Sequence, residues 1–359
     1  MKQLLLCILL TFTHVSFSQK SINYNQKAEE YLKKGNYKEA VPLLTLALKL
    51  IPKDVSALRN RAMCYERLEK FDLALKDNLE LLKLDKSAST LGSIGYDYLW
   101  LEKYDEARKF LNEAIIIAPS DIIFHYNKAL TYQYADNFEQ AIIAYDEALM
   151  VDPNHMPSLV SKTRCLLKSK LYDKASAIVD TFFIQKKFDV EMLLFRGDIK
   201  KHFGKIEDAL HAYNRAIAIN PDDIFLLEKT ARCLNELGLY EEEIEIRKRE
   251  IEIQFNKGEK NDVKSITFAT LAIAQEAAGY FEEAQNNYSE SIKLDPTGGD
   301  GRVYFLRCIL NAKMKDFEGA CKDLAKSKEF NPDNAGEYDQ YFEEDEEFEE
   351  FVKYCMPNP

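Results

Sequence analysis

Residues that make tight turns are scarce in this chain, which has 13 glycines and 10 prolines among 359 residues. A β-sandwich or β-barrel needs many such turns, so their scarcity favours long helices joined by short connections. Hydrophobic residues make up 46% of the chain and charged residues 30%. This balance is typical of a globular protein and argues against a disordered or membrane-embedded one.

Apolar runs long enough to span a membrane are also missing. The longest apolar run lies in the first residues, MKQLLLCILLTFTHVSFSQK. Lys2 precedes an apolar run over 4–12, which is too short for the ~20 residues of a membrane span. Ser16 and Ser18 then form a small-x-small cleavage site, so we predict a signal peptide over 1–18. The alternative is an uncleaved anchor. The cleavage site before Gln19 is similar to those of Gram-negative bacteria, and we expect a secreted or periplasmic protein without a membrane span.

Motifs that carry chemistry are absent. The mature chain has only four histidines, and neither a His-x-x-x-His pair nor a Cys-x-x-Cys pair occurs. The glycine-rich TGGDG at 297–301 follows a proline and indicates a turn, so no phosphate-binding loop is predicted. We therefore expect no enzyme activity, no catalytic residue, no metal and no cofactor. The net charge of −12 and the lack of a basic stripe argue against nucleic acid as a partner.

One pattern does recur along the chain, with a period close to 34 residues. A signature alanine returns at 40, 74, 107, 141, 175 and 209, Glu243 takes the next position, and alanine returns at 284 and 320. Three residues before this position, eight of nine repeats have Tyr or Phe, and twelve before it each repeat has a small residue. Six of nine repeats have proline twelve residues after it. The small residues are Ala28, Ala62, Gly95, Ala129, Thr163, Gly197, Ala231, Ala272 and Cys308.

These positions predict a helical hairpin. Small residues let two antiparallel helices approach closely, an aromatic residue fills the space at the turn, and proline ends the repeat because it cannot continue a helix. One hairpin cannot bury its own apolar face, so consecutive hairpins stack into a solenoid with a continuous core.

The ladder of small, aromatic and proline positions resembles the tetratricopeptide repeat family, of a secreted or periplasmic bacterial type, over about 20–332. The resemblance implies an all-α, right-handed α-α superhelical solenoid of about nine hairpins, closed by a C-terminal capping helix. We expect repeats one to seven over 19–255, repeats eight and nine over 256–332, and the cap over 333–359. Repeat five departs from the pattern, with Phe182 where alanine is preferred.

The step from Glu243 to Ala284 is seven residues longer than the period. The polar stretch QFNKGEKNDVKS at 254–265 is where we place the insertion, as a longer loop or an extended helix. A bend of the superhelix is expected there.

In the tetratricopeptide repeat family the first helices of the hairpins line a concave groove that holds extended peptides or partner helices. The fifth, ninth, twelfth and thirteenth positions of each repeat are exposed in that groove. The resemblance therefore implies a scaffold that binds a protein or peptide partner through an aromatic centre flanked by arginines. The groove residues that it implies are Arg59, Met63, Arg67, Tyr96, Trp100, Tyr126, Leu130, Tyr134 and Arg164.

Other interpretations stay open. The same aromatic residues can pack between adjacent repeats without touching a partner. The chain can also be a structural subunit of an envelope or secretion assembly, or an accessory protein that binds glycans. The Lys–Asn pair with which some family members grip a peptide carboxylate is missing, so that variant is not predicted.

The tail is acidic, with ten carboxylates between Asp333 and Glu350. A site for a basic partner or for Ca²⁺ is one interpretation. We favour a solvated cap, because Phe348, Phe351, Val352 and Cys355 form an apolar stripe beneath the acidic face.

Cysteines fall into two groups once the repeats are aligned. Cys64, Cys165 and Cys233 share the tenth position of their repeats, too far apart to pair, and are expected to be small buried hydrophobes. GACKDLAKS followed by a terminal KYC resembles the closing repeat of many secreted bacterial tetratricopeptide proteins. That resemblance implies a disulfide between Cys321 and Cys355; the alternative is that both are free and buried. A Cα separation above ~7 Å would exclude the bond.

Overall fold

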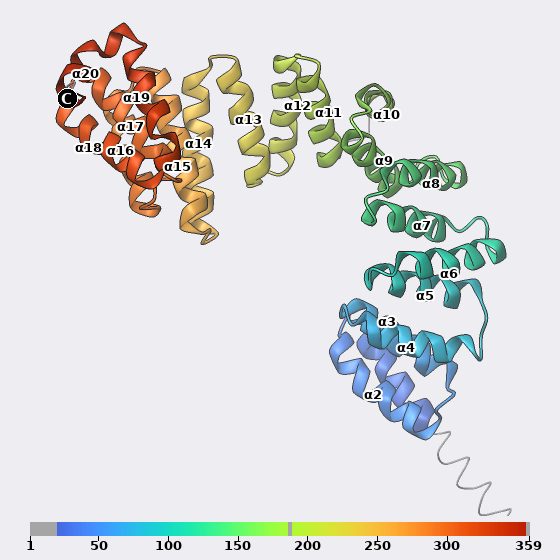
Figure 1. Ribbon diagram of the computed structural model, residues 1–359. Helices are drawn as coiled ribbons and strands as arrows, with labels where there is room; N and C mark the ends of the chain where they lie inside the picture. The colour runs from blue at the N-terminus through green and yellow to red at the C-terminus, as the bar shows by residue number, and fades with distance from the viewer. Residues whose placement is uncertain (1–19, 186–188, 357–359) are drawn as a thin grey trace, which may run out of the picture. The chain divides into compact units, whose positions relative to one another are not determined.

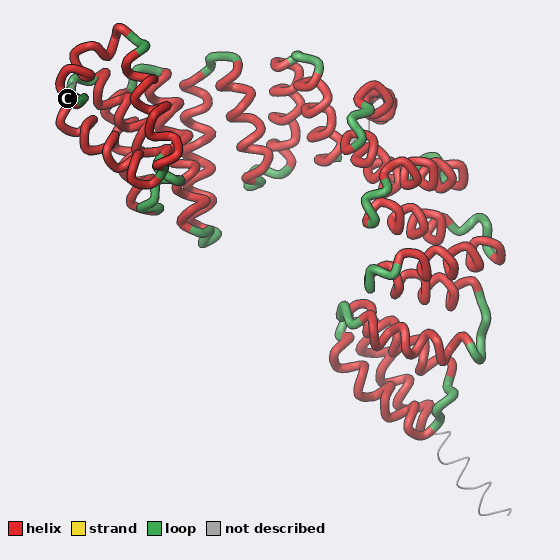
Figure 2. Tube along the Cα trace, viewed as in Figure 1, coloured by secondary structure: helices red, strands yellow, loops and turns green. Residues whose placement is uncertain are grey.

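The structure is a computed structural model that describes residues 20–185 and 189–356. The predicted signal peptide lies outside the described residues. Every regular element among the described residues is helical (Figure 2). Neighbouring helices pack as consecutive hairpins in the order in which they follow in the chain, from α2 to α9 and from α11 to α18 (Figure 1). The all-α solenoid of stacked hairpins expected from the repeat is therefore confirmed.

The chain divides into two compact units, Met1–Ile178 and Val179–Pro359. In the first unit residues 20–33 form a helix, followed by eight helices and the start of α10. Their bounds are α2 Tyr37–Leu50, α3 Val55–Arg67, α4 Phe71–Leu82, α5 Ala88–Trp100, α6 Tyr104–Ile117, α7 Ile122–Tyr134, α8 Phe138–Val151, α9 Met156–Lys168 and α10 Tyr172–Ile184.

The second unit continues the pattern and ends in a capping region. Its helices are α11 Val190–His202, α12 Ile206–Ile219, α13 Ile224–Glu236, α14 Tyr240–Asn256, α15 Asn261–Ala277, α16 Phe281–Leu294, α17 Arg302–Lys313, α18 Phe317–Phe330, α19 Ala335–Glu343 and α20 Glu349–Cys355, with short 3-10 turns at Pro332–Asn334 and Glu346–Phe348.

The small residues of the repeat allow the paired helices to approach closely. Ala62, Ala74 and Ala129 are at most 1% exposed, so nothing larger than a methyl group separates the paired helices. Asp54, Asp121, Asp189 and Asp223 each cap a first helix by accepting a hydrogen bond from a backbone N–H in the first turn.

The extra residues of repeats seven and eight lengthen two helices. α14 and α15 have 17 residues each, against 12 to 14 in the other repeat helices from α2 to α18. Only residues 257–260 join them. Of the two expected forms of the insertion, a longer loop or an extended helix, the structure has the extended helix. The bend expected there, and the domain bounds derived from it, stay predictions.

The cap consists of two short helices, where one helix was expected. The acidic segment between α19 and α20 turns at Asp345, whose carboxylate accepts the backbone N–H of Glu347. Phe348 and Phe351 are 2% and 1% exposed and pack with Phe342 and Leu324 in the core beneath the cap. The acidic side chains stay at the surface, as a solenoid end requires.

Candidate partner-binding site

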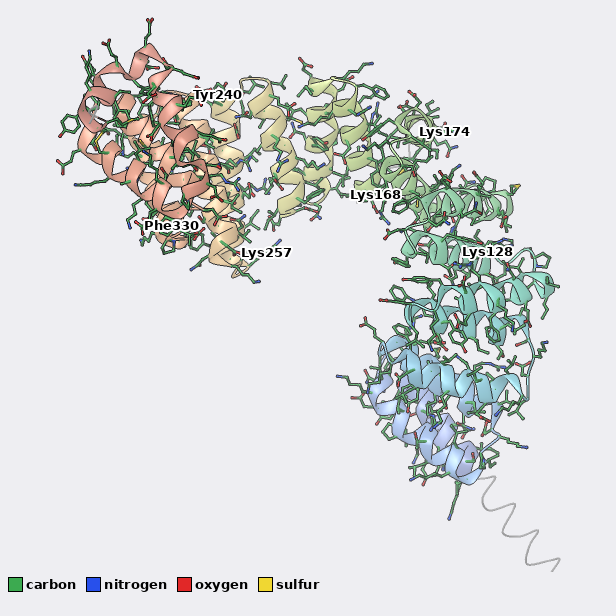
Figure 3. All side chains as sticks on the ribbon, in the orientation of Figure 1. Lys128, Lys168, Lys174, Tyr240, Lys257 and Phe330 are labelled. Carbon is green, nitrogen blue, oxygen red and sulfur yellow. A yellow bond between two sulfur atoms is a disulfide. The ribbon has the colours of Figure 1, made fainter. Side chains whose placement is uncertain are left out.

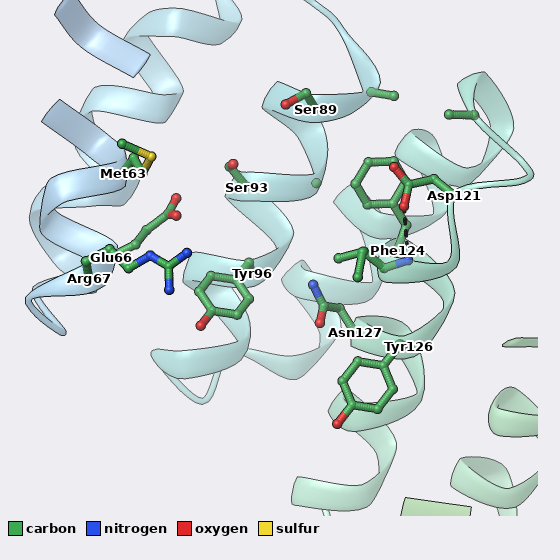
Figure 4. A pocket seen from close by; sticks show the side chains of 14 residues that line it. Met63, Glu66, Arg67, Ser89, Ser93, Tyr96, Asp121, Phe124, Tyr126 and Asn127 are labelled. Atoms are coloured by element: carbon green, nitrogen blue, oxygen red, sulfur yellow. Dashed lines mark hydrogen bonds between the residues drawn. The ribbon is translucent and has the colours of Figure 1, made fainter. Parts of the chain in front are cut away.

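A cavity in the first unit lies on the first helices of three consecutive repeats. Its volume is about 520 Å³, and α3, α5 and α7 line it. Figure 4 shows Met63, Glu66 and Arg67 on one side, Phe124, Tyr126 and Asn127 on the other, and Tyr96 between them. Its lining comprises Met63, Glu66, Arg67, Ala88, Ser89, Gly92, Ser93, Tyr96, Ala118, Asp121, Ile123, Phe124, Tyr126 and Asn127.

Four of the nine predicted groove residues meet in this lining: Met63, Arg67, Tyr96 and Tyr126. They come from three different repeats, which is what stacking of equivalent positions requires. Tyr126 also contacts His155, with ring centroids 5.3 Å apart in an edge-to-face arrangement.

An aromatic cluster adjoins the cavity through Tyr96. The indole of Trp100 stacks on Phe71, with centroids 5.7 Å apart and planes at 14°. The Tyr134 ring lies 5.8 Å from Trp100, and Tyr96 lies 6.0 Å from it. These rings pack between adjacent repeats and are also partly exposed to solvent. Trp100 and Tyr134 expose 42% and 45% of their surface. Exposed aromatic rings with this much area are typical of interaction hot spots.

The other three predicted residues do not line the cavity. Arg59 is exposed and forms an ion pair with Asp85, with Nη2 2.8 Å from Oδ2. Leu130 is 7% exposed and belongs to the hydrophobic core. Arg164 is half-buried on α9.

Sequence reasoning missed the second and sixth positions of the first helices. Ser89 and Ser93 line the cavity from these positions on α5, and Asn127 lines it from the sixth position of α7. Asn127 is 6% exposed, and no hydrogen bond joins its amide to any side chain or backbone group that the structure describes. The available signal was the small polar character of these three residues on the first helices.

Gly92 sets the floor of the cavity. A Cβ atom at this position would lie 2.2 Å from a carbon of the Phe124 ring, so the ring packs directly on the helix backbone. Any larger residue would displace Phe124 toward the lining. The cavity therefore depends on a glycine inside a helix, which costs about 0.5–1 kcal/mol relative to alanine.

A buried polar cluster lies behind the cavity. The amide of Asn78 on α4 donates to Asp97, 2.8 Å away, and to Glu66, 3.2 Å away. Asp97 is fully buried, and burial raises its pKa to about 8 against the opposing hydrogen bond from Asn78. Burial also raises the pKa of Glu66. Both shifts have the same cause, because a carboxylate loses its hydration inside the protein.

The cysteines keep their two groups. Cys64, Cys165, Cys233 and Cys308 are free and buried. Burial raises the pKa of the Cys64 and Cys165 thiols to about 11, which keeps them protonated and poorly nucleophilic. Cys321 and Cys355 are joined by a disulfide, with their Cα atoms 5.4 Å apart. That separation lies inside the range that a disulfide can span.

Among residues 20–185 and 189–356, no group of three or more His, Cys, Asp or Glu side chains is arranged to hold a metal ion. No helix in these ranges is both long and apolar enough to cross a bilayer.

Comparison with known proteins agrees with the repeat. Profiles described as tetratricopeptide repeat match residues 25–89, 122–155 and 190–223. The chain thus contains tetratricopeptide repeats, and the matches fall on repeats in both compact units.

Among curated proteins, the chain is 22% identical over 348 residues to the DnaJ homolog subfamily C member 7 homolog of Dictyostelium discoideum, covering 86% of this chain and 62% of that protein. It is 21% identical over 318 residues to human Tetratricopeptide repeat protein 6, covering 85% of this chain and 59% of that protein. The chain thus spans about three fifths of the length of these relatives.

Among solved structures, the chain is similar to PilW, described as a widely conserved type IV pilus biogenesis factor. The TM-score is 0.50 at 22% identity, over 56% of this chain and 94% of PilW. At this identity the likeness concerns the fold alone.

Proposed function

We propose that the chain is a non-enzymatic scaffold that binds an extended segment of a protein partner in the cavity on α3, α5 and α7 and on the adjoining aromatic cluster. One observation carries this proposal: three consecutive first helices present Met63, Tyr96 and Tyr126 to a single cavity. The tetratricopeptide repeats and the names of the relatives, among them a rat mitochondrial import receptor subunit that is 38% identical over 72 residues, support a role in protein interaction. That match covers 20% of this chain and 23% of the rat protein.

The chemistry of the lining suits a peptide with both apolar and polar groups. Met63 and Phe124 offer apolar surface, whereas the Arg67 guanidinium and the Asn127 amide offer hydrogen-bond donors. The Asn127 amide can donate to a backbone carbonyl and accept from a backbone N–H of the same ligand. An extended segment exposes both groups, because it forms no internal hydrogen bonds.

We also propose that the protein acts outside the cytoplasm. The apolar run and the small-x-small site in residues 1–18 support export. The Cys321–Cys355 pair supports it too, because structural disulfides persist mainly in oxidising compartments.

Pull-down of partners with the wild type and a Trp100→Ala/Tyr134→Ala variant tests the groove. The variant should lose most of the captured partner, because each truncation of a hot-spot aromatic costs about 2 kcal/mol or more. Ile116→Ala/Ile143→Ala is the matched control, since these residues are 79% and 52% exposed on the second helices α6 and α8.

The two variants separate the leading proposal from its alternative. Equal capture by the wild type and the Trp100→Ala/Tyr134→Ala variant would show that the groove is not the binding surface. Loss of capture in the Ile116→Ala/Ile143→Ala variant alone would support a structural subunit that holds partners by its outer helices.

A further inference from the structure

An arginine–aspartate pair recurs at equivalent positions of repeats two and nine. Arg61, directly before the small residue of its first helix, forms two hydrogen bonds to Asp77 on the second helix, at 2.7 and 2.8 Å. Arg307 does the same with Asp323, at 2.8 and 2.7 Å. Both aspartates are buried, so each pair neutralises a cation inside its hairpin.

Repeat four also pairs a cation on its first helix with an acid on its second helix, but with different residues. Its cation is Lys128 (labelled in Figure 3), and its carboxylate is Glu147, three residues beyond the aspartate position of the other repeats. Nζ and Oε2 are 2.7 Å apart. Each of these three cations is thus paired with an acid on the second helix of its own hairpin.

Repeat six has the cation without either acid. Arg196 on α11 occupies the arginine position, but the aspartate position holds Ala212 and the glutamate position holds Arg215. In the part of the chain that the structure describes, no carboxylate forms an ion pair with Arg196 or with Lys200, one turn further along α11.

A cavity opens where the acid is missing. Its volume is about 90 Å³, and it lies between α11 and α12, which pack side by side (Figure 1). Arg196 and Lys200 line it from α11, and Asp208, His211, Ala212 and Arg215 line it from α12. Three cationic side chains and one carboxylate thus line the cavity, in a chain whose net charge is −12.

The guanidinium groups of Arg196 and Arg215 both contact one aromatic ring. The central carbons of Arg196 and Arg215 lie 5.0 and 5.8 Å from the centroid of the Phe183 ring. Cation–π attraction to the Phe183 ring orients both groups.

We propose that this cavity between α11 and α12 binds a small oxyanion of the phosphate or sulfate type, free or carried by a small phosphomonoester. The cavity volume of about 90 Å³ is well above the roughly 10–15 Å³ that one water needs on this measure, which leaves room for one such group. Arginine suits this ligand because its planar fork donates two parallel hydrogen bonds to a tetrahedral oxyanion. The site lies in the second compact unit and does not depend on the proposed groove.

Isothermal titration of inorganic phosphate into the full chain at low ionic strength tests this proposal. The wild type should bind one phosphate saturably. Ala212→Asp restores the acid that repeats two and nine carry, so phosphate affinity should fall at least about tenfold, equivalent to ~1.4 kcal/mol. Lys200→Gln should weaken binding in the same direction and keeps the experiment decisive if Ala212→Asp does not fold, because Lys200 is only half-buried.

Lys201→Gln is the matched control, since it removes the same charge from the next residue of α11 but Lys201 pairs with Glu236 outside the cavity. Its phosphate affinity should match the wild type. A parallel titration with glycerol phosphate distinguishes the two ligand sources. Tighter binding of inorganic phosphate indicates a site for a free anion, and tighter binding of glycerol phosphate indicates a site for a phosphomonoester. Absence of saturable binding of either ligand by the wild type, or unchanged binding by Lys200→Gln, would overturn the proposal.

Discussion

Asp97 shows how a single residue makes the stability of this protein depend on pH. Its carboxyl is fully buried, and one of its oxygens, Oδ1, has no hydrogen-bond partner in the described structure. Ionisation therefore costs free energy in the folded state and little in the unfolded state. The folded protein binds the proton more tightly, which is what the raised pKa of about 8 expresses.

The contribution of Asp97 to the free energy of unfolding is complete below its ordinary pKa of 3.8 and is lost as the pH rises through about 8. We predict that Asp97→Asn removes this slope and unfolds at a higher urea concentration than the wild type above that pH. Urea unfolding at a series of pH values across the window measures both effects.

Asp72→Asn is the control for this experiment, because Asp72 is exposed on the neighbouring helix α4. Its slope should follow that of the wild type. An Asp97→Asn protein that keeps the full pH dependence of the wild type would show that Asp97 is hydrated in solution.

At the scale of the element, α14 carries three charged residues at buried positions, Glu243, Arg247 and Glu250. Glu243 stands where other repeats have the signature alanine, and it is 2% exposed. Arg247 lies between Glu243 and Glu250, with Nε 3.5 Å from one carboxylate and Nη1 3.0 Å from the other. Burial raises the pKa of Glu250, although Arg247 opposes this. The cluster lies in the extended helix that contains the insertion.

Removing the cation should destabilise this layer strongly. We predict that Arg247→Met costs about 3–5 kcal/mol, because it leaves two buried carboxylates without a counter-charge. Adding Glu243→Ala and Glu250→Gln should recover most of that loss, because the layer is then neutral and has the alanine of the other repeats. Chemical denaturation of the two variants measures the difference.

Lys248→Met provides the comparison, since Lys248 is exposed beside Arg247 and pairs with Glu245. Its loss should cost at most about 1 kcal/mol. Equal unfolding midpoints for Arg247→Met and Lys248→Met would contradict the view that the α14 charges are buried.

How far the sequence predicts an element depends on whether it follows the period. The helices and their buried alanines follow from it, because each repeat must pack against its neighbour in the same way. The floor of the cavity does not, since it depends on Phe124 meeting Gly92 in the next repeat. The cation cavity of repeat six was missed for a related reason: Ala212 matters only when it is compared with Asp77 and Asp323 in equivalent three-dimensional positions.

At the scale of the whole molecule, the apolar face of the last repeat has to be covered at the C-terminal end of the solenoid. The second unit ends in α19 and α20, whose aromatic residues cover α18. These helices have nine and seven residues, too short to be stable alone in water. The disulfide between Cys321 on α18 and Cys355 on α20 holds them against the last repeat.

We predict that the exported, processed chain contains one disulfide and four thiols that react only after denaturation. The full sequence has seven cysteines. Cys7 is removed with the predicted signal peptide, which leaves four buried free cysteines and the Cys321–Cys355 pair. Thiol titration of native and denatured protein, combined with the N-terminal sequence of the exported chain, checks both the pairing and the cleavage before Gln19. Six thiols in the denatured, processed chain would contradict the disulfide, and a fifth thiol together with an unprocessed N-terminus would contradict the cleavage.

The bond closes a loop with a sequence separation of 34, worth about 3–4 kcal/mol in the chain-entropy model. Cys321→Ser/Cys355→Ser should therefore lower the stability of the cap and make α19 and α20 exchange their amide hydrogens faster than α16 and α17. Cys308→Ala is the demanding control: Cys308 lies in the same core but is free, so this variant removes packing without opening the loop. If the disulfide holds the cap, the amide exchange of α19 and α20 in the Cys321→Ser/Cys355→Ser variant should match that of the wild type treated with a reductant, because both proteins lack the bond. The Cys308→Ala variant should not match it.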